Sequence, residues 1–184
     1  MNNNARPLIV RIRNWIGDVV LGLPALRLLE AQGHELHLVA RGKWAPSLLA
    51  GESWSVHVQP AKLTDKVKQL RQLRRTLKDR DPTFDRRENT LLLPVSLSSA
   101  LEARLAGLRA VGFSKEGRTP LMARGVPVIH TGHELTRYFG LAAAFLGVQA
   151  TAPERNRLAL QPEKAAAAQA LLTEAGIPER FMMI

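Results

Sequence analysis

The sequence predicts an α/β fold in which a parallel sheet carries helices on both faces. Short apolar runs alternate with longer helical patterns along most of the 184 residues. Parallel strands need crossover connections, and the helical patterns between the runs supply them. Ligands of such sheets bind at the carboxyl ends of the strands, so we expect the functional residues in the loops that follow strands.

The first half of the chain predicts three strands and three helices in alternation. β-rich runs of strand length occupy residues 7–13, 34–41 and 55–61. Helical patterns occupy residues 18–32, 44–51 and 66–80. In the last of these, Val67, Leu70, Leu73 and Leu77 recur at helical spacing while Lys and Arg fill the other faces, which indicates an amphipathic helix.

The second half continues the same order after a charged turn at 81–89. Strand-like runs occupy residues 90–96 and 108–114, and helical patterns occupy 98–107, 132–147 and 163–176. The helix at 98–107 starts like a capped one, with Ser98 or Ser99 as the cap and Glu102 placed to answer it. Gly147 is expected to end the long helix at 132–147. Residues 181–184 resemble the onset of a further strand.

Charge and composition narrow the functional classes. The formal net charge of +10 favours an anionic partner, such as a phosphorylated glycolipid, an acidic membrane face or nucleic acid. The basic helix at 66–80 is either a solvated face or a polyanion site. No aromatic residues alternate with its bases and no zinc-finger or RNA-recognition signature is present, which disfavours nucleic acid. The chain has no cysteine, no apolar run long enough to span a membrane and no histidines at metal-ligand spacing, so we expect a cytoplasmic protein without a metal site.

The loop after the first strand contains Asn14, Trp15, Gly17 and Asp18. Gly17 lies where a strand becomes a helix, so the backbone can turn tightly there and approach a ligand closely. Asp18 at the helix start either caps free amides or acts as a general base toward a hydroxyl. A dinucleotide fingerprint is absent, and a carboxylate here would repel phosphate, which favours a neutral sugar or hydroxyl.

Two further groups of polar residues are candidates. Ser96, Ser98 and Ser99 follow the strand at 90–96 and are either helix caps or sugar contacts. His133 and Arg137 are four residues apart and share a helix face, which is also the arrangement of an ordinary surface pair.

The motifs resemble one family in the same order along the chain. NWIGDVVLGLPALRLL (14–29) resembles the opening motif of the ADP-heptose:lipopolysaccharide heptosyltransferases, glycosyltransferase family 9, and NWIGD is most similar to the heptosyltransferase II type. Residues 91–122 are similar to the family's fourth strand, serine-containing loop and next strand. HELTRYFGLAAAFLG (133–147) is similar to the helix before the interdomain linker, and GIPERFMMI (176–184) to the lead into the second domain.

This resemblance implies a GT-B enzyme whose Rossmann-like N-terminal lobe, here residues 1–150, binds the acceptor. Residues 151–184 would be the linker and the start of a truncated C-terminal lobe, which binds most of the ADP-heptose. Transfer to the anionic inner core of lipopolysaccharide would invert the anomeric centre without a metal or other cofactor, in contact with the cytoplasmic face of the inner membrane.

The same resemblance assigns roles to individual residues. Asp18 matches the aspartate that deprotonates the acceptor hydroxyl, and Asn14, Trp15 and Gly17 shape its loop. The residues that would contact the acceptor are Ser96, Ser98, Ser99, Arg118, His133 and Arg137. Because the donor-binding residues belong to the second lobe, we expect this chain to be inactive alone. The alternative is a stand-alone Rossmann-like module that binds nucleic acid or another polyanion.

Overall fold

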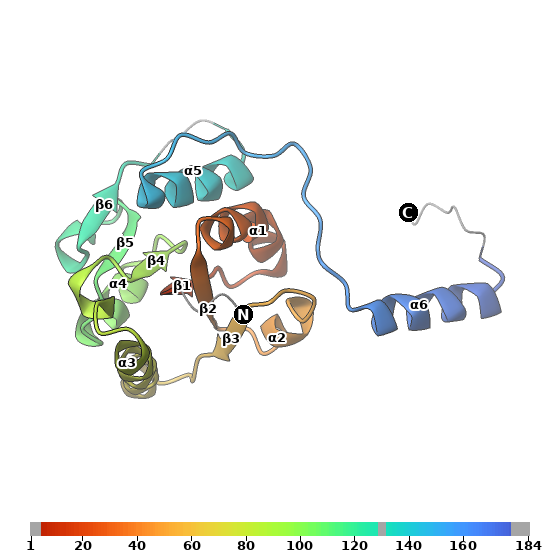
Figure 1. Ribbon diagram of the computed structural model, residues 1–184, viewed down its shortest axis with the longest axis horizontal. Coiled ribbons are helices and arrows are strands. Elements are labelled where there is room, and N and C mark those ends of the chain that lie inside the picture. Colours follow the sequence, from red (N-terminus) through yellow and green to blue (C-terminus); the bar gives the residue numbers. More distant parts are fainter. Residues whose placement is uncertain (1–4, 129–131, 178–184) are drawn as a thin grey trace.

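The computed structural model describes residues 5–128 and 132–177 and contains a six-stranded parallel sheet in the order β3-β2-β1-β4-β5-β6 (Figure 1). The strands are β1 (Arg6–Arg11), β2 (His34–Ala40), β3 (Ser55–Val58), β4 (Thr90–Leu92), β5 (Ala110–Phe113) and β6 (Arg124–Val126). The predicted α/β class, with a Rossmann-like parallel sheet, is confirmed. The edge strand β6 was not predicted.

The helices are α1 (Ile16–Ala31), α2 (Ala45–Leu48), α3 (Leu63–Arg80), α4 (Leu97–Leu105), α5 (Glu134–Leu146) and α6 (Pro162–Glu174). Two 3₁₀ segments, η1 (Phe84–Arg86) and η2 (Thr119–Leu121), lie in the connections. The six predicted helices are therefore all present. The strand onset expected at 181–184 lies outside the described residues.

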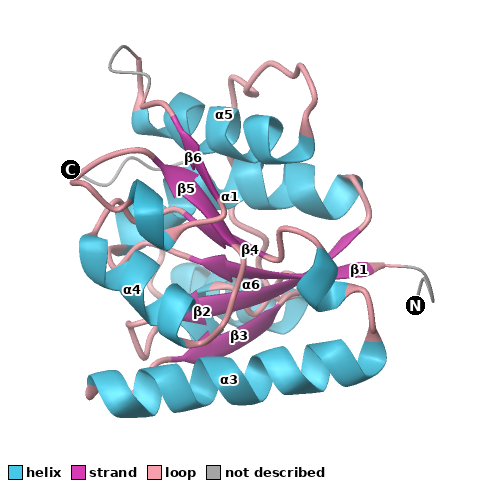
Figure 2. Ribbon diagram, turned by 90° about the vertical axis from the view of Figure 1, so that its left-hand side faces the viewer, coloured by secondary structure: helices cyan, strands magenta, loops and turns pink. Residues whose placement is uncertain are grey.

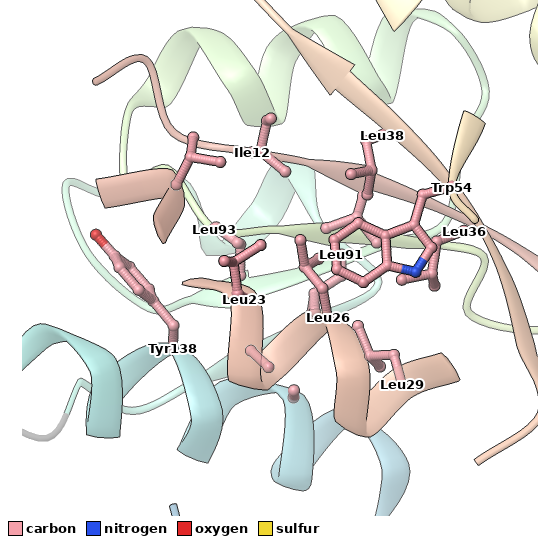
Figure 3. Close-up of a cluster of buried hydrophobic side chains, with 14 of the residues drawn as sticks. Ile12, Leu23, Leu26, Leu29, Leu36, Leu38, Trp54, Leu91, Leu93 and Tyr138 are labelled. Atoms are coloured by element: carbon pink, nitrogen blue, oxygen red, sulfur yellow. The ribbon is translucent and has the colours of Figure 1, made fainter. Parts of the chain in front are cut away.

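Helices cover both faces of the sheet, as the sequence predicted. Successive strand residues point to opposite faces, so Leu8 and Val10 of β1 pack with α1 and α5, while Ile9 packs with α3 and α4. Figure 2 shows α3 along one side of the strands and α5 on the other. Figure 3 shows the first of these two cores, in which Leu23 and Leu26 of α1 face the sheet.

The helix ends follow local sequence only in part. Gly147 ends α5 with a left-handed φ of 70°, as predicted. The N-cap of α4 is Ser96, whose Oγ accepts a hydrogen bond from the amide of Ser99, so the prediction of Ser98 or Ser99 as cap is wrong. Glu102 does not complete a capping box, because its carboxylate bonds to Gln59 and Lys66 instead.

The strand order places a switch point between β1 and β4. The chain builds β1, β2 and β3 outward in one direction and then returns to place β4 on the other side of β1. Connections on the two sides leave the sheet in opposite directions there, and ligands of open α/β sheets bind at such points. A functional site is therefore expected at the carboxyl ends of β1 and β4.

The segment after α5 packs on the body of the fold, where Asn156 donates to the carbonyl of Val20 and Leu158 contacts the first core, and only the last helix lies apart. After α5 an extended segment leads to α6, which projects away from the strands in Figure 1. Every residue of α6 is exposed or half-buried. Over the described ranges, no helix is long and apolar enough to cross a membrane.

Candidate functional site

A small polar cavity lies at the switch point, at the carboxyl ends of β1 and β4. Its volume is about 30 Å³. The lining residues come from β1 and the loops after β1, β2 and β4, together with α3 and α4, and they are Arg11, Asn14, Arg41, Lys66, Pro94, Ser96, Ser98, Ser99 and Glu102. Four of the sequence candidates, Asn14 and the three serines, are thereby brought together.

Buried charged side chains form the floor of this cavity. Glu102 is held by Lys66, with Nζ 3.1 Å from Oε1, and by the amide of Gln59, 3.3 Å from Oε2. Arg11 is 7% exposed and donates from Nη1 to the carbonyl of Val39 at 3.2 Å. Burial lowers the pKa of Arg11 to about 10, against the opposing charge of Glu102. These charges lie on the α3 and α4 side of the sheet.

Asp18 lies at the same edge but on the α1 and α5 side. It belongs to the first turn of α1, where the N-cap residue is Trp15, so the alternative in which Asp18 is the cap is wrong. Its Oδ1 accepts a hydrogen bond from the hydroxyl of Tyr138 at 3.2 Å, and Oδ2 lies 3.4 Å from Nε of Arg13. The carboxylate remains 19% exposed. A negative charge near a helix N-terminus is also stabilised by the helix dipole.

Tyr138 reaches Asp18 from α5. Its ring is buried among apolar side chains, and Figure 3 shows the hydroxyl pointing away from the labelled leucines. Burial and the nearby carboxylates raise the pKa of Tyr138, so its hydroxyl stays protonated and donates to Asp18.

The loop between β1 and α1 and the first turn of α1, which contains Gly17, are open to solvent. Asn14 and Gly17 are exposed, and the side chain of Trp15 is 76% exposed. A Cβ added at Gly17 would meet no atom within 4 Å, so packing within the chain gives no reason for glycine there. Close approach of a ligand is the reason that the sequence suggested.

Arg118 does not lie on the surface. It is 0% exposed, and its guanidinium donates to the carbonyls of Phe113 at 2.9 Å and Pro94 at 2.6 Å. It also donates to the carbonyl of Ser96 at 3.2 Å. This burial disagrees with the expected contact between Arg118 and an acceptor. Arg118 instead holds the loop before α4 in place through its bonds to the carbonyls of Pro94 and Ser96.

His133 and Arg137 lie at the start of α5. His133 is the N-cap, and its Nδ1 accepts from the amide of Leu135 at 3.3 Å. Arg137 forms an ion pair with Glu134. Both residues are within two turns of Tyr138, so they lie on the Asp18 side of the site and not among the residues that line the polar cavity.

Sequence reasoning missed Arg11, Arg13 and Tyr138. Arg11 was detectable as a charged residue at the end of an otherwise apolar strand, whereas the sequence carries no signal of the contact between Tyr138 and Asp18. Within the described part of the chain, no group of three or more His, Asp or Glu side chains is placed to hold a metal ion.

Comparisons with known proteins identify the fold. No protein-family model and no curated protein matches the chain. A solved glycosyl transferase of family 9 from Veillonella parvula matches 99% of the chain with a TM-score of 0.70 and 15% identity. The ADP-heptose lipopolysaccharide heptosyltransferase II of Escherichia coli matches 94% with a TM-score of 0.62 and 20% identity. Escherichia coli heptosyltransferase WaaC, solved with ADP-2-deoxy-2-fluoro heptose, matches 81% with a TM-score of 0.55 and 18% identity.

The match covers only part of each of those proteins. The chain spans 53%, 51% and 50% of their respective lengths, which is about half. At these identities the similarity shows the fold. The chain therefore has the α/β fold that makes up about half of these family 9 glycosyltransferase structures.

Proposed function

We propose that the chain is the acceptor-binding lobe of a glycosyltransferase that moves heptose from ADP-heptose to the inner core of lipopolysaccharide. The observation that carries this proposal is the partly exposed carboxylate of Asp18, held from two sides at the carboxyl edge of the sheet. The fold shared with family 9 glycosyltransferases and the motif at 14–29 support the choice of reaction.

Asp18 is the general base in this proposal. An acceptor hydroxyl hydrogen-bonded to the carboxylate loses its proton to Asp18 as its oxygen attacks the anomeric carbon of the donor. The bond between that carbon and the ADP oxygen breaks on the opposite side, which inverts the centre. Asn14, Trp15 and Gly17 border the acceptor, and Ser96, Ser98 and Ser99 contact it. His133 and Arg137 face it from the start of α5.

The rest of the reaction belongs to groups outside this chain in our proposal. Charge on the departing ADP needs stabilisation, and a second lobe, to which residues 151–184 would contribute the linker and the first part, would supply it. Residues 1–150 are then the acceptor lobe. We further propose that the enzyme works at the cytoplasmic face of the inner membrane, where the net charge of +10 is attracted to anionic lipid.

The polyanion-binding alternative receives less support from the basic helix. Arg74 and Lys78 of α3 pair with Asp85, and Arg80 pairs with Glu35. Bases that are already paired with carboxylates are poorly available to phosphates, so α3 fits a solvated helix face better than a nucleic-acid site.

A transfer assay with matched variants tests the proposal. Radiolabelled ADP-heptose and a heptose-deficient inner-core acceptor are incubated with the full product of the gene that encodes this chain. Asp18→Asn is expected to lower transfer by about 10²- to 10⁴-fold, the usual contribution of general base catalysis. Asp65→Asn, the same change in the first turn of α3, is the control. Unchanged transfer in Asp18→Asn would remove Asp18 as the base, and no transfer by the unmodified protein would count against the reaction.

A further inference from the structure

Arg11 is a buried cation that the proposed chemistry at Asp18 does not use. It closes the central strand β1 with 7% of its surface exposed. Its Nη1 donates to the carbonyl of Val39, and its Nε–H has no hydrogen-bond partner among the described residues. Arg11 forms no ion pair within 4 Å among the described residues, although the charge of Glu102 acts on it, and a buried guanidinium with an unsatisfied donor is costly.

The carboxylate of Glu102, whose charge acts on Arg11, is already hydrogen-bonded to other residues. One of its oxygens pairs with Lys66 and the other accepts from Gln59. The cavity lining holds Arg11, Arg41 and Lys66 against Glu102, which leaves a surplus of two positive charges. The surplus positive charge of the lining therefore favours the binding of an anion in the cavity.

The cavity also offers neutral donors and an opening. Ser96 is the N-cap of the nine-residue helix α4 and takes up the amide of Ser99, so the amides at the start of the helix that remain for a ligand beside the cavity are those of Leu97 and Ser98. Ser98 and Asn14 line it and are exposed, as is Arg41. A ligand would therefore enter the cavity between the loops after β1 and β4 and contact Arg11 at its floor.

We propose that this cavity is an oxyanion subsite, distinct from Asp18, that takes a carboxylate or phosphate group carried by the acceptor. The link to an acceptor rests on the function proposed above. A volume of about 30 Å³ admits one small group and not a sugar ring, so the subsite recognises a charged substituent while the sugar lies outside. Arg11 and Arg41 supply the charge, and Ser96, Ser98 and the amides of α4 supply further donors.

Binding of simple anions tests this subsite without any donor or transfer. The ¹⁵N-labelled 184-residue chain is titrated at constant ionic strength with inorganic phosphate in one arm and D-glucuronate in the other. Saturable shifts are expected at the amides of Asn14, Ser96 and Ser98. Saturation by phosphate alone would identify a phosphate site, and saturation by glucuronate alone a carboxylate site. Shifts spread over the surface without saturation would overturn the proposal.

Variants separate the subsite from general attraction to a basic protein. Arg11→Met removes the charge, keeps similar volume and is expected to weaken anion binding at least 10-fold. Arg75→Met, which removes an exposed base of α3, is the control and should bind as the unmodified chain does. Equal affinity in Arg11→Met would overturn the proposal. If Arg11→Met does not fold, Arg41→Gln, at an exposed position of the same lining, replaces it with the same expectation of weaker binding.

The two proposals fail in different ways. Asp18→Asn is expected to bind phosphate or glucuronate with unchanged affinity, because Asp18 does not line the cavity. Anion binding that depends on Arg11, without heptose transfer, would keep the subsite and reject the function. Heptose transfer with the same KM for the acceptor in Arg11→Met would keep the function and reject the subsite.

Discussion

The hydroxyl of Tyr138 donates a hydrogen bond to Oδ1 of Asp18 across 3.2 Å and joins two positions that lie 120 residues apart in the chain. The contact connects α5 to the start of α1, the two helices that pack on the same face of the sheet. Since Arg13 lies beside the other oxygen, the carboxylate is fixed in direction but still partly exposed. Tyr138 is thus a positioning residue for the proposed base.

Tyr138→Phe is expected to lower kcat of heptose transfer about 3- to 10-fold and to leave KM for the acceptor nearly unchanged. A hydrogen bond to a charged group contributes about 1.5 kcal/mol or somewhat more, and the loss of up to about that amount from the transition state corresponds to this range. The phenyl ring keeps the packing against α1, so the midpoint of urea unfolding should move little. Loss of kcat together with a large loss of stability would indicate a structural role instead.

The sequence predicted the fold because the buried strands and helices carry regular patterns. Strands β1, β2 and β4 are apolar runs covered on both faces, and the helices show the matching period. The strand β6 escaped because Arg124–Val126 is a short edge strand with one apolar side chain, and it forms only by pairing with β5. The predicted cap of α4 was two or three residues too late because Ser96, Ser98 and Ser99 are equivalent in propensity.

The site residues that could be predicted are those that directly follow a strand, because that position decides where they lie. Asn14, Asp18 and Ser96 follow strands, and the sheet topology places them at one edge. Tyr138 was not predictable, because its partner is distant in sequence. The burial of Arg118 was not predictable either, because its partners are main-chain carbonyls that leave no trace in residue identity.

Arg118→Ala is expected to destabilise the chain by about 2–5 kcal/mol in urea unfolding. The substitution leaves the carbonyls of Phe113, Pro94 and Ser96 without their buried donor. Arg118→Lys should not restore stability, since a single ammonium cannot reproduce the planar fork that reaches both loops. Arg75→Ala serves as the exposed control. Stability within 0.5 kcal/mol of the unmodified chain, the usual range of surface substitutions, would contradict this role.

Ser96→Ala is expected to cost about 1 kcal/mol of folding free energy, the usual value for a lost N-cap. The Oγ of Ser96 accepts from the amide of Ser99 at 3.4 Å. Ser98→Ala is the matched control, because Ser98 is exposed and caps no helix end. Equal costs for the two variants in urea unfolding would show that the cap adds nothing.

Stability is expected to fall as the pH is lowered from about 6.5 to about 4. Burial, with the nearby charge of Arg6, lowers the pKa of His34 from 6.5 to about 4 in the folded chain. Between these values the unfolded chain binds a proton that the folded chain does not, so stability is complete above pH 6.5 and is lost toward pH 4. Burial lowers the pKa of His37 and His57 as well, and they act with the same sign.

The contribution of His34 is isolated by comparing His34→Gln with the unmodified chain in urea unfolding at pH 7.5, 6.5, 5.5 and 5.0. The unmodified chain should lose about 1–2 kcal/mol more than His34→Gln between pH 7.5 and pH 5.0. This window excludes carboxylates such as Glu35, whose pKa is lowered by its bond to Arg80, because their stabilisation is lost only at lower pH. His34 is buried, so its protonation would place a further positive charge in a poorly solvated site with Arg6 and Arg87 nearby. The same pH slope in both proteins would show that His34 is protonated in the folded state without cost.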